Sequence, residues 1–69
     1  MQVFDLSTDY IELCQLLKAS GAMESGGAAK QAIGEGKVTV DGVVELRKKC
    51  KIRPGQVVEM GAFSVKVSG

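Results

Sequence analysis

The strongest constraint on the fold is a change of hydrophobic period at Gly36, near the middle of the 69-residue chain. Before Gly36, apolar residues recur at helical spacing, as in Tyr10, Leu13 and Leu17. After it, apolar and polar residues alternate, as in the segment 37–40. A period near 3.6 is typical of helices and a period of 2 is typical of strands. The sequence therefore predicts helices followed by a sheet: an α+β fold, in a single domain spanning residues 1–69.

A first helix is expected over residues 9–20. Asp9 is a good N-cap residue, and Glu12 three positions later makes a pair that resembles a capping box. Gly21 follows the last apolar residue of the pattern, where a left-handed backbone commonly ends a helix.

A second helix is expected from a cap at Ser25 to about Glu35, with Gly36 as its terminator. Its apolar face is narrow and built mainly from alanines, which allows close approach to the first helix. We therefore expect the two helices to form a compact pair.

The second half predicts a small, mostly antiparallel sheet. Asp41-Gly42 is a strong hairpin signal, and Arg53-Pro54-Gly55-Gln56 has proline at the second position of a turn. One further short strand near the N-terminus is expected at an edge. The expected strands are residues 3–6, 37–40, 43–46, 57–60 and 62–67.

Positive charge is concentrated in one part of the chain although the net charge is only +1. Residues 1–36 hold two lysines and five acidic residues, whereas residues 37–53 hold six cations and two acids. Five of these cations lie between Arg47 and Arg53. Such a cluster suits phosphate contacts, because binding releases counterions from the nucleic acid. A solvated loop that keeps the protein soluble is the alternative, and the residues leave both open.

The stretch Ser25-Gly26-Gly27 opens the second helix with residues that are poor helix formers. Glycines there leave the free N–H groups of a helix start open to an anion, and Lys30 lies one turn further along. The alternative is capping by Ser25, with glycines required because the first helix packs too closely for a Cβ. The residues alone favour this alternative. The stretch lacks the full pattern of a nucleotide-binding P-loop.

The chain has no histidine, which excludes the usual triads and His-containing zinc sites. No acidic pair suits acid–base catalysis, so we expect neither an enzyme nor a bound cofactor or metal.

Cys14 and Cys50 are expected as reduced thiols, with the pKa of Cys50 lowered by Lys49 and Lys51. No secretory signal and no apolar stretch long enough for a membrane is present, so a cytoplasmic location is expected.

These pieces follow an order that resembles the alpha-L RNA-binding motif, the RNA-binding domain found in small-subunit ribosomal protein S-four. The resemblance is carried by LLKASG, by the SGG helix start with Lys30, by GKVTVDG and by KIRPGQ, and it covers about residues 10–67. The SGG start is similar in particular to a subgroup of small bacterial proteins that consist of this domain alone.

The resemblance implies RNA binding, without catalysis, in a groove between the helix pair and the basic rim of the sheet. Many family members have an arginine where this chain has Gly26. Together with the basic cluster and the glycines, the expected RNA-binding residues are Lys18, Ser25, Gly26, Gly27, Lys30, Lys37, Arg47, Lys48, Lys49, Lys51 and Arg53.

The expected partner is structured RNA, ribosomal or transfer RNA, recognised by shape and phosphate contacts. Stacking on unpaired bases is not expected, because the chain has three aromatic rings and at least two are needed for the core. The alternative function is that of an adaptor that docks on a ribosome or an RNA-processing enzyme through protein contacts. A monomer is expected in either case.

Overall fold

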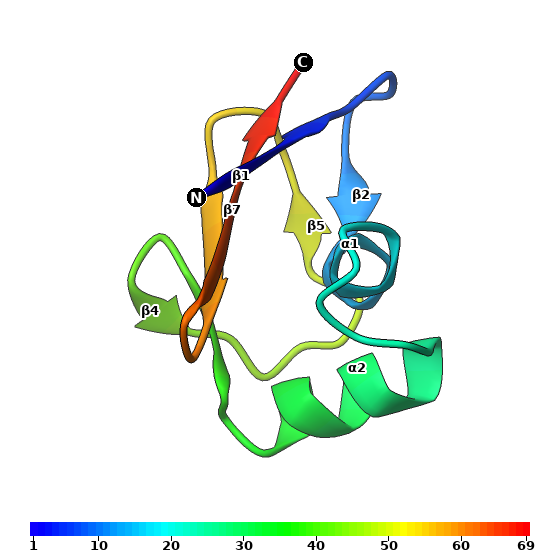
Figure 1. The fold of residues 1–69 in the computed structure, drawn as a ribbon, viewed down its shortest axis with the longest axis vertical. Coiled ribbons are helices and arrows are strands. Elements are labelled where there is room, and N and C mark those ends of the chain that lie inside the picture. Colours follow the sequence, from blue (N-terminus) through cyan, green and yellow to red (C-terminus); the bar gives the residue numbers. More distant parts are fainter.

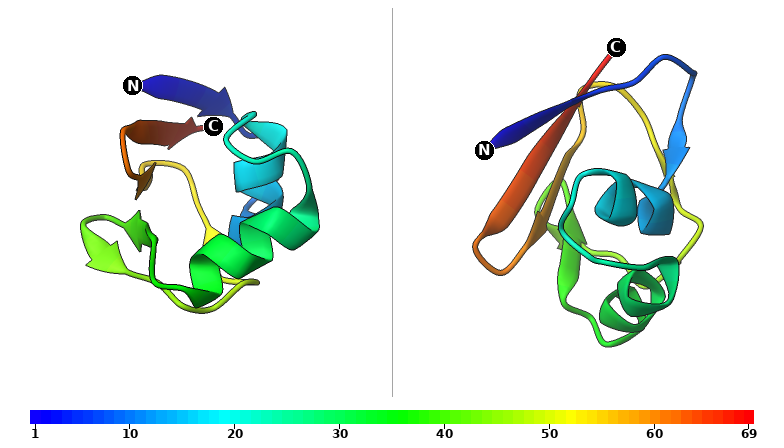
Figure 2. Two further views of the ribbon diagram at one scale, coloured as in Figure 1. Left: turned by 60° about the horizontal axis from the view of Figure 1, so that its bottom comes forward. Right: turned by 45° about the vertical axis from the view of Figure 1, so that its right-hand side comes forward.

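The computed structural model describes all of residues 1–69 and has the predicted α+β architecture (Figure 1). Two helices lie on one side of a five-stranded sheet, and a separate two-stranded ribbon adjoins the first helix (Figure 2). The helices are α1 (Leu13–Ala19) and α2 (Gly26–Gly34). The sheet has the order β1 (Gln2–Asp5), β7 (Phe63–Ser68), β6 (Val57–Met60), β3 (Val38–Val40) and β4 (Val43–Val44), and the ribbon pairs β2 (Ile11–Glu12) with β5 (Lys51–Ile52).

The sheet is mixed rather than fully antiparallel. β1 pairs in parallel with β7, while the β7–β6, β6–β3 and β3–β4 pairs are antiparallel. The predicted edge position of the N-terminal strand is confirmed. The hairpin is also confirmed: Asp41 and Gly42 have φ of 51° and 84°, the left-handed pair that a tight two-residue hairpin turn requires.

The predicted start of the first helix is wrong. Ile11 and Glu12 form strand β2, and α1 begins after Glu12, whose side chain makes no cap hydrogen bond. The first N–H groups of α1 are bonded instead to a distant loop: Leu13 donates to the Cys50 carbonyl at 2.9 Å and Cys14 to the Lys48 carbonyl at 3.1 Å. This tertiary contact replaces the local capping box that Asp9 and Glu12 were expected to form.

The predicted ends of both helices, and the start of the second, are confirmed. Gly21 and Gly36 follow the two C-caps with φ of 86° and 77°, where a side chain would be strained. The Ser25 hydroxyl accepts a hydrogen bond from the Ala28 N–H at 3.1 Å, as an N-cap should.

The core lies between the helix pair and the sheet, and thirteen apolar residues are buried in it. Phe4 and Phe63 pack against its edge. None of the helices has the length and apolar character needed to cross a membrane. The buried residues are Leu13, Cys14, Leu16 and Leu17 from α1, Ala29, Ala32 and Ile33 from α2, and Val38, Val40, Ile52, Val58, Val65 and Val67 from the strands.

Candidate nucleic-acid interface

Residues 47–53, which we call the basic segment, run from the β4 side of the molecule past the start of α1 and into β5 (Figure 1). The Lys48 and Cys50 carbonyls are fixed by the α1 N–H groups described above. The Cys50 N–H also donates to the Arg47 carbonyl at 3.2 Å, which closes a turn. Because the backbone is held from inside, its lysine and arginine side chains remain exposed to solvent.

One end of the basic segment reaches α2 as well. A Cβ built on Gly34, in the last turn of α2, would lie 3.9 Å from Cε of Lys48. The segment is therefore bonded to the start of α1 and passes close to the end of α2, which places Lys48 beside the helix pair.

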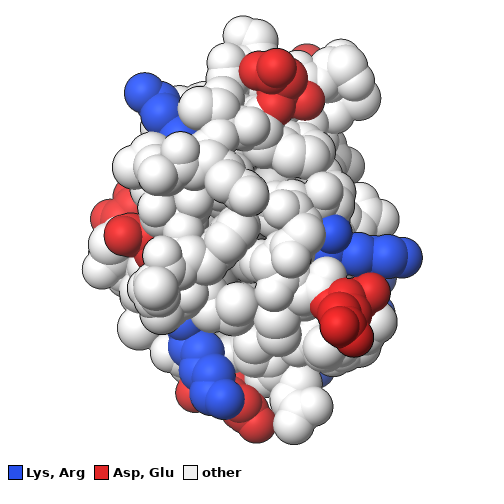
Figure 3. All heavy atoms as spheres, viewed as in Figure 1, with Lys and Arg blue, Asp and Glu red and all other residues white.

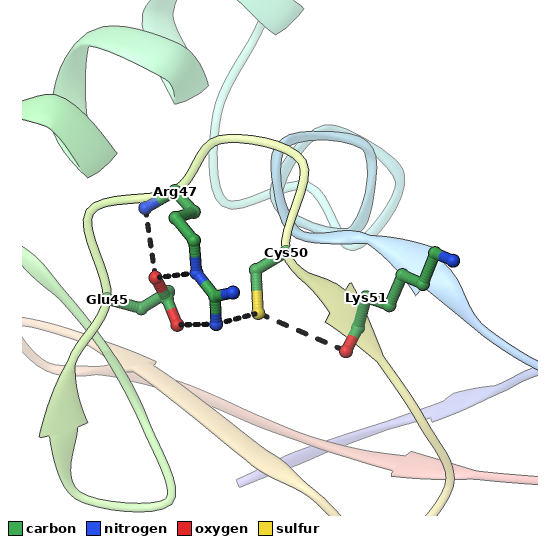
Figure 4. A network of polar contacts seen from close by, with 4 residues as sticks. All are labelled: Glu45, Arg47, Cys50 and Lys51. Atoms are coloured by element: carbon green, nitrogen blue, oxygen red, sulfur yellow. Dashed lines mark hydrogen bonds and ion pairs between the residues drawn. The ribbon is translucent and has the colours of Figure 1, made fainter.

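Arg47 is held by Glu45 rather than free (Figure 4). One carboxylate oxygen accepts from the Arg47 backbone N–H and from its Nε, both at 3.0 Å, and the other accepts from Nη2 at 3.1 Å. These hydrogen bonds lower the pKa of Glu45 to about 2 and raise the pKa of Arg47. Arg47 therefore enters any RNA contact with its charge already partly compensated.

The predicted lowering of the Cys50 pKa is wrong. Partial burial of the thiol raises its pKa, and the Glu45 carboxylate raises it further, against the smaller opposite effect of Arg47. Nη2 of Arg47 lies 3.8 Å from Sγ, whereas no lysine ammonium contacts it (Figure 4). The lysines adjacent in sequence were a poor guide to this pKa, because burial and Glu45 determine its shift and neither lysine contributes to it. Cys14 and Cys50 are both free.

Four cations of the basic segment, Lys48, Lys49, Lys51 and Arg53, form no ion pair. The molecule has only two ion pairs, Arg47 with Glu45 and Lys37 with Glu35, the latter at 3.0 Å. The hydrogen bond from Lys37 lowers the pKa of Glu35. Of the cations predicted on the helices, Lys18 lies in the last turn of α1 and Lys30 in the middle of α2, and both are exposed and unpaired.

The start of α2 does not require glycine for packing. A Cβ on Gly26 would meet nothing within 4 Å, and a Cβ on Gly27 would meet only Oγ of Ser25 at 3.9 Å. The expectation that α1 packs too closely for a side chain is therefore wrong. The N–H groups of Gly26 and Gly27 have no partner in the protein, since Ser25 caps Ala28 and Ala29.

The predicted residues form a spread surface rather than one pocket. Ser25 caps one end of α2 and Lys48 lies beside Gly34 at the other, and these two ends are about 13.5 Å apart along the axis at 1.5 Å per residue. On the face in Figure 3, charged groups of both signs surround a broad uncharged centre. The densest run of cations is the basic segment, and Lys18 and Lys30 add single positive charges on the two helices.

Tyr10 is a candidate that reasoning from the sequence missed. The residue is 40% exposed, with Nζ of Lys51 at 5.0 Å and Cζ of Arg53 at 5.7 Å from the ring centroid. The helical spacing of Tyr10, Leu13 and Leu17 predicts a helix through this residue, whereas the residues that follow it, Ile11 and Glu12, form strand β2.

The chain packs two helices on a small sheet, with an exposed basic segment fixed beside the helix pair, and it belongs to the S4 domain family. The model of the S4 domain family matches residues 4–68, which extends the resemblance seen in the sequence to β1. A protein of Escherichia coli (strain K12) called "Putative RNA-binding protein YbcJ" is 57% identical over 58 residues, which cover 84% of this chain and 83% of that protein. "Uncharacterized protein YbcJ" of Shigella flexneri has the same identity, 57% over 58 residues, and the same coverage of both chains.

The solved structure of E. coli YbcJ confirms the predicted alpha-L fold. It superposes with a TM-score of 0.79 at 51% sequence identity, covering 100% of this chain and 89% of that one. That solution structure is described as revealing an alfaL motif involved in RNA-binding.

Proposed function

We propose that this protein binds structured RNA, without catalysis, through the basic segment and the adjoining helix pair. The observation that carries the proposal is the anchoring of the segment: the Lys48 and Cys50 carbonyls accept hydrogen bonds from the start of α1. The backbone is fixed while four unpaired cations face solvent. A surface of fixed cations suits a phosphate backbone of defined shape better than it suits a flexible partner.

The helix cations and the start of α2 widen this surface. Lys18 and Lys30 are exposed, and the N–H groups of Gly26 and Gly27 are open to solvent. Since helix starts favour anions, we place a second phosphate contact there, a helix length from Lys48. Two separated contacts favour a folded RNA over a mononucleotide, and ribosomal or transfer RNA provides such a fold. The relatives named for RNA binding support the RNA-binding part of this proposal.

The proposal is tested by titrating a labelled RNA hairpin with the protein at several salt concentrations. We expect tight binding at low salt, with a log–log salt slope that falls by about one for each phosphate contact removed. Lys49→Ala should weaken binding and reduce the slope. Lys66→Ala is the matched control, because Lys66 is an exposed lysine on β7 outside the proposed surface.

Two results would contradict RNA binding by the basic segment. One is no measurable binding at low salt. The other is an equal loss of affinity in Lys49→Ala and Lys66→Ala, which would indicate a general charge effect rather than a localised interface.

An adaptor function is the second candidate, favoured by an exposed apolar strip at and just after the edge strand β4. Val43, Val44 and Leu46 are 70%, 53% and 59% exposed. Apolar side chains at a sheet edge suit a protein contact. Partners on a ribosome or an RNA-processing enzyme that survive RNase treatment in a pull-down, and are lost in Val43→Ser, would favour this candidate.

A further inference from the structure

The short β2–β5 ribbon has one buried face and one exposed face. Ile52 is fully buried and its register partner Ile11 is half-buried against the core. Since side chains alternate along a strand, the residues on either side of this pair point outward. Extending the register places Tyr10 opposite Arg53, with Lys51 diagonally across from Tyr10.

The exposed face therefore combines an aromatic ring with two cations. Both cations lie within 6 Å of the Tyr10 ring centroid, the range in which the ring attracts a positive charge. Neither Lys51 nor Arg53 forms an ion pair. The ring thus holds two flexible side chains at one place, and their charges stay available to a ligand.

Tyr10 is also the one aromatic residue that the core leaves exposed. Phe4 and Phe63 pack against the core cluster, as the need for a filled core predicted, whereas Tyr10 is 40% exposed. Its hydroxyl makes no hydrogen bond in the protein; only its carbonyl is used, accepting from the Thr8 hydroxyl at 2.9 Å. Core packing and internal hydrogen bonding therefore leave much of the ring exposed.

Lys51 connects this face to the rest of the basic segment. Arg47, Lys49, Cys50 and Lys51 line one shallow hollow, and Lys51 is also the cation closest to the Tyr10 ring. A strand of RNA whose phosphates lie along the hollow would bring its next nucleotide to the ring.

We propose that Tyr10, Lys51 and Arg53 bind an unpaired nucleotide of the RNA, with the base stacked on the Tyr10 ring and the flanking phosphates on the two cations. The inference rests on the proposed function and adds to it a preference for RNA that carries unpaired bases beside its folded part. It revises the expectation that no ring is free for stacking. Stacking on an aromatic side chain tolerates any base, so the site selects unpaired structure rather than sequence.

The chain itself supplies a specific probe, because Tyr10 is its only tyrosine and it has no tryptophan. Intrinsic tyrosine emission therefore reports this site alone, and a stacked base quenches it. We compare an RNA hairpin with a loop of unpaired bases against a blunt duplex of equal phosphate number, with free N-acetyl-tyrosinamide correcting for absorption by the RNA. Binding is followed separately by the anisotropy of a label on the RNA.

We expect the looped hairpin to quench Tyr10 emission with the same concentration dependence as its binding, while the duplex binds without quenching. Binding of the looped hairpin with unchanged emission overturns the stacking site and leaves the proposed RNA binding intact. Failure of both RNAs to bind at low salt overturns the proposed function and this inference together.

Variants give an independent measurement. Tyr10→Leu should weaken binding of the looped hairpin at least about fivefold more than it weakens binding of the duplex. Tyr10→Phe is the matched control that keeps the ring and should keep the affinity. If Tyr10→Leu loses the same affinity for the looped hairpin as for the duplex, the ring only positions the cations, and the stacking site is overturned.

Discussion

At the scale of single residues, Glu45 organises the start of the basic segment. It is the more buried partner of its ion pair, with a side chain 18% exposed against 77% for Arg47. The carboxylate bonds both the backbone and the guanidinium of Arg47, and it also disfavours ionisation of the nearby Cys50 thiol. One acidic residue thus fixes a cation and adds to the effect of burial in raising the pKa of Cys50, although it lies inside a region that the sequence marks as basic.

The depressed pKa of Glu45 predicts a specific loss of stability in acid. Its pKa is about 2 in the folded chain against an ordinary 4.5, so its stabilising effect is complete above 4.5 and disappears as the pH falls from 4.5 toward 2. Glu45→Gln should therefore have a lower melting temperature than the wild type at about pH 7, and the two melting temperatures should converge as the pH falls to about 2.

Circular dichroism melts across this pH range measure the effect. Glu59→Gln, which removes an exposed acid outside both ion pairs, is the control. If the melting temperature of Glu45→Gln lies below that of the wild type by the same amount at every pH, the carboxylate charge does not cause the difference.

At the scale of elements, the two helices begin by different means. α1 begins where strand β2 ends and is capped by carbonyls of the basic segment. α2 begins with a local serine cap and two glycines that no packing contact requires. The α1 start is therefore occupied by protein, whereas the α2 start has free N–H groups for a phosphate.

Replacing the α2 glycines separates stability from binding. Gly26→Ala and Gly27→Ala should each raise the free energy of unfolding by about 0.5–1 kcal/mol, because alanine fits and restricts the unfolded chain. RNA affinity should fall, since a methyl group hinders a phosphate from reaching the N–H groups. Urea denaturation and RNA titration measure the two effects.

Gly21→Ala makes the same chemical change where φ is +86°, with equally open space. It should destabilise by about 1–2 kcal/mol, since only glycine adopts that backbone without strain. Gly26→Ala and Gly27→Ala with unchanged RNA affinity would leave the basic segment as the sole phosphate contact.

At the scale of the whole molecule, the interface depends on a very small core. Thirteen buried residues join two halves of opposite charge, and α1 contributes four of them. The same helix holds the basic segment by its first N–H groups. Folding of the core and presentation of the cations are therefore one event.

Leu17→Ala should show how narrow the margin of stability is. Leu17 is fully buried, and its truncation costs about 2–5 kcal/mol. A chain of 69 residues has only about 3–10 kcal/mol in total. We expect a large shift of the urea midpoint and a parallel loss of RNA binding. Leu46→Ala, at a 59% exposed site, should change stability by less than about 0.5 kcal/mol, and an equal effect of both variants would contradict this core.

Features set by neighbouring residues could be predicted from the sequence. The helix ends at Gly21 and Gly36, the Ser25 cap and the Asp41-Gly42 hairpin each depend on local backbone preferences, and the structure confirms all of them. The α+β order and the alpha-L resemblance followed from the change of period and from short motifs.

Features set by distant residues required the tertiary structure. The start of α1 depends on carbonyls more than thirty residues away, and the exposure of Tyr10 depends on the pairing of β2 with β5. The Cys50 pKa depends first on burial, which folding sets, and then on Glu45 rather than on the adjacent lysines. The sequence alone determined which residues turn, cap and alternate, because those preferences act within a few residues. Only the folded chain decided where α1 begins and which ring is exposed, because both depend on contacts between segments far apart in the sequence.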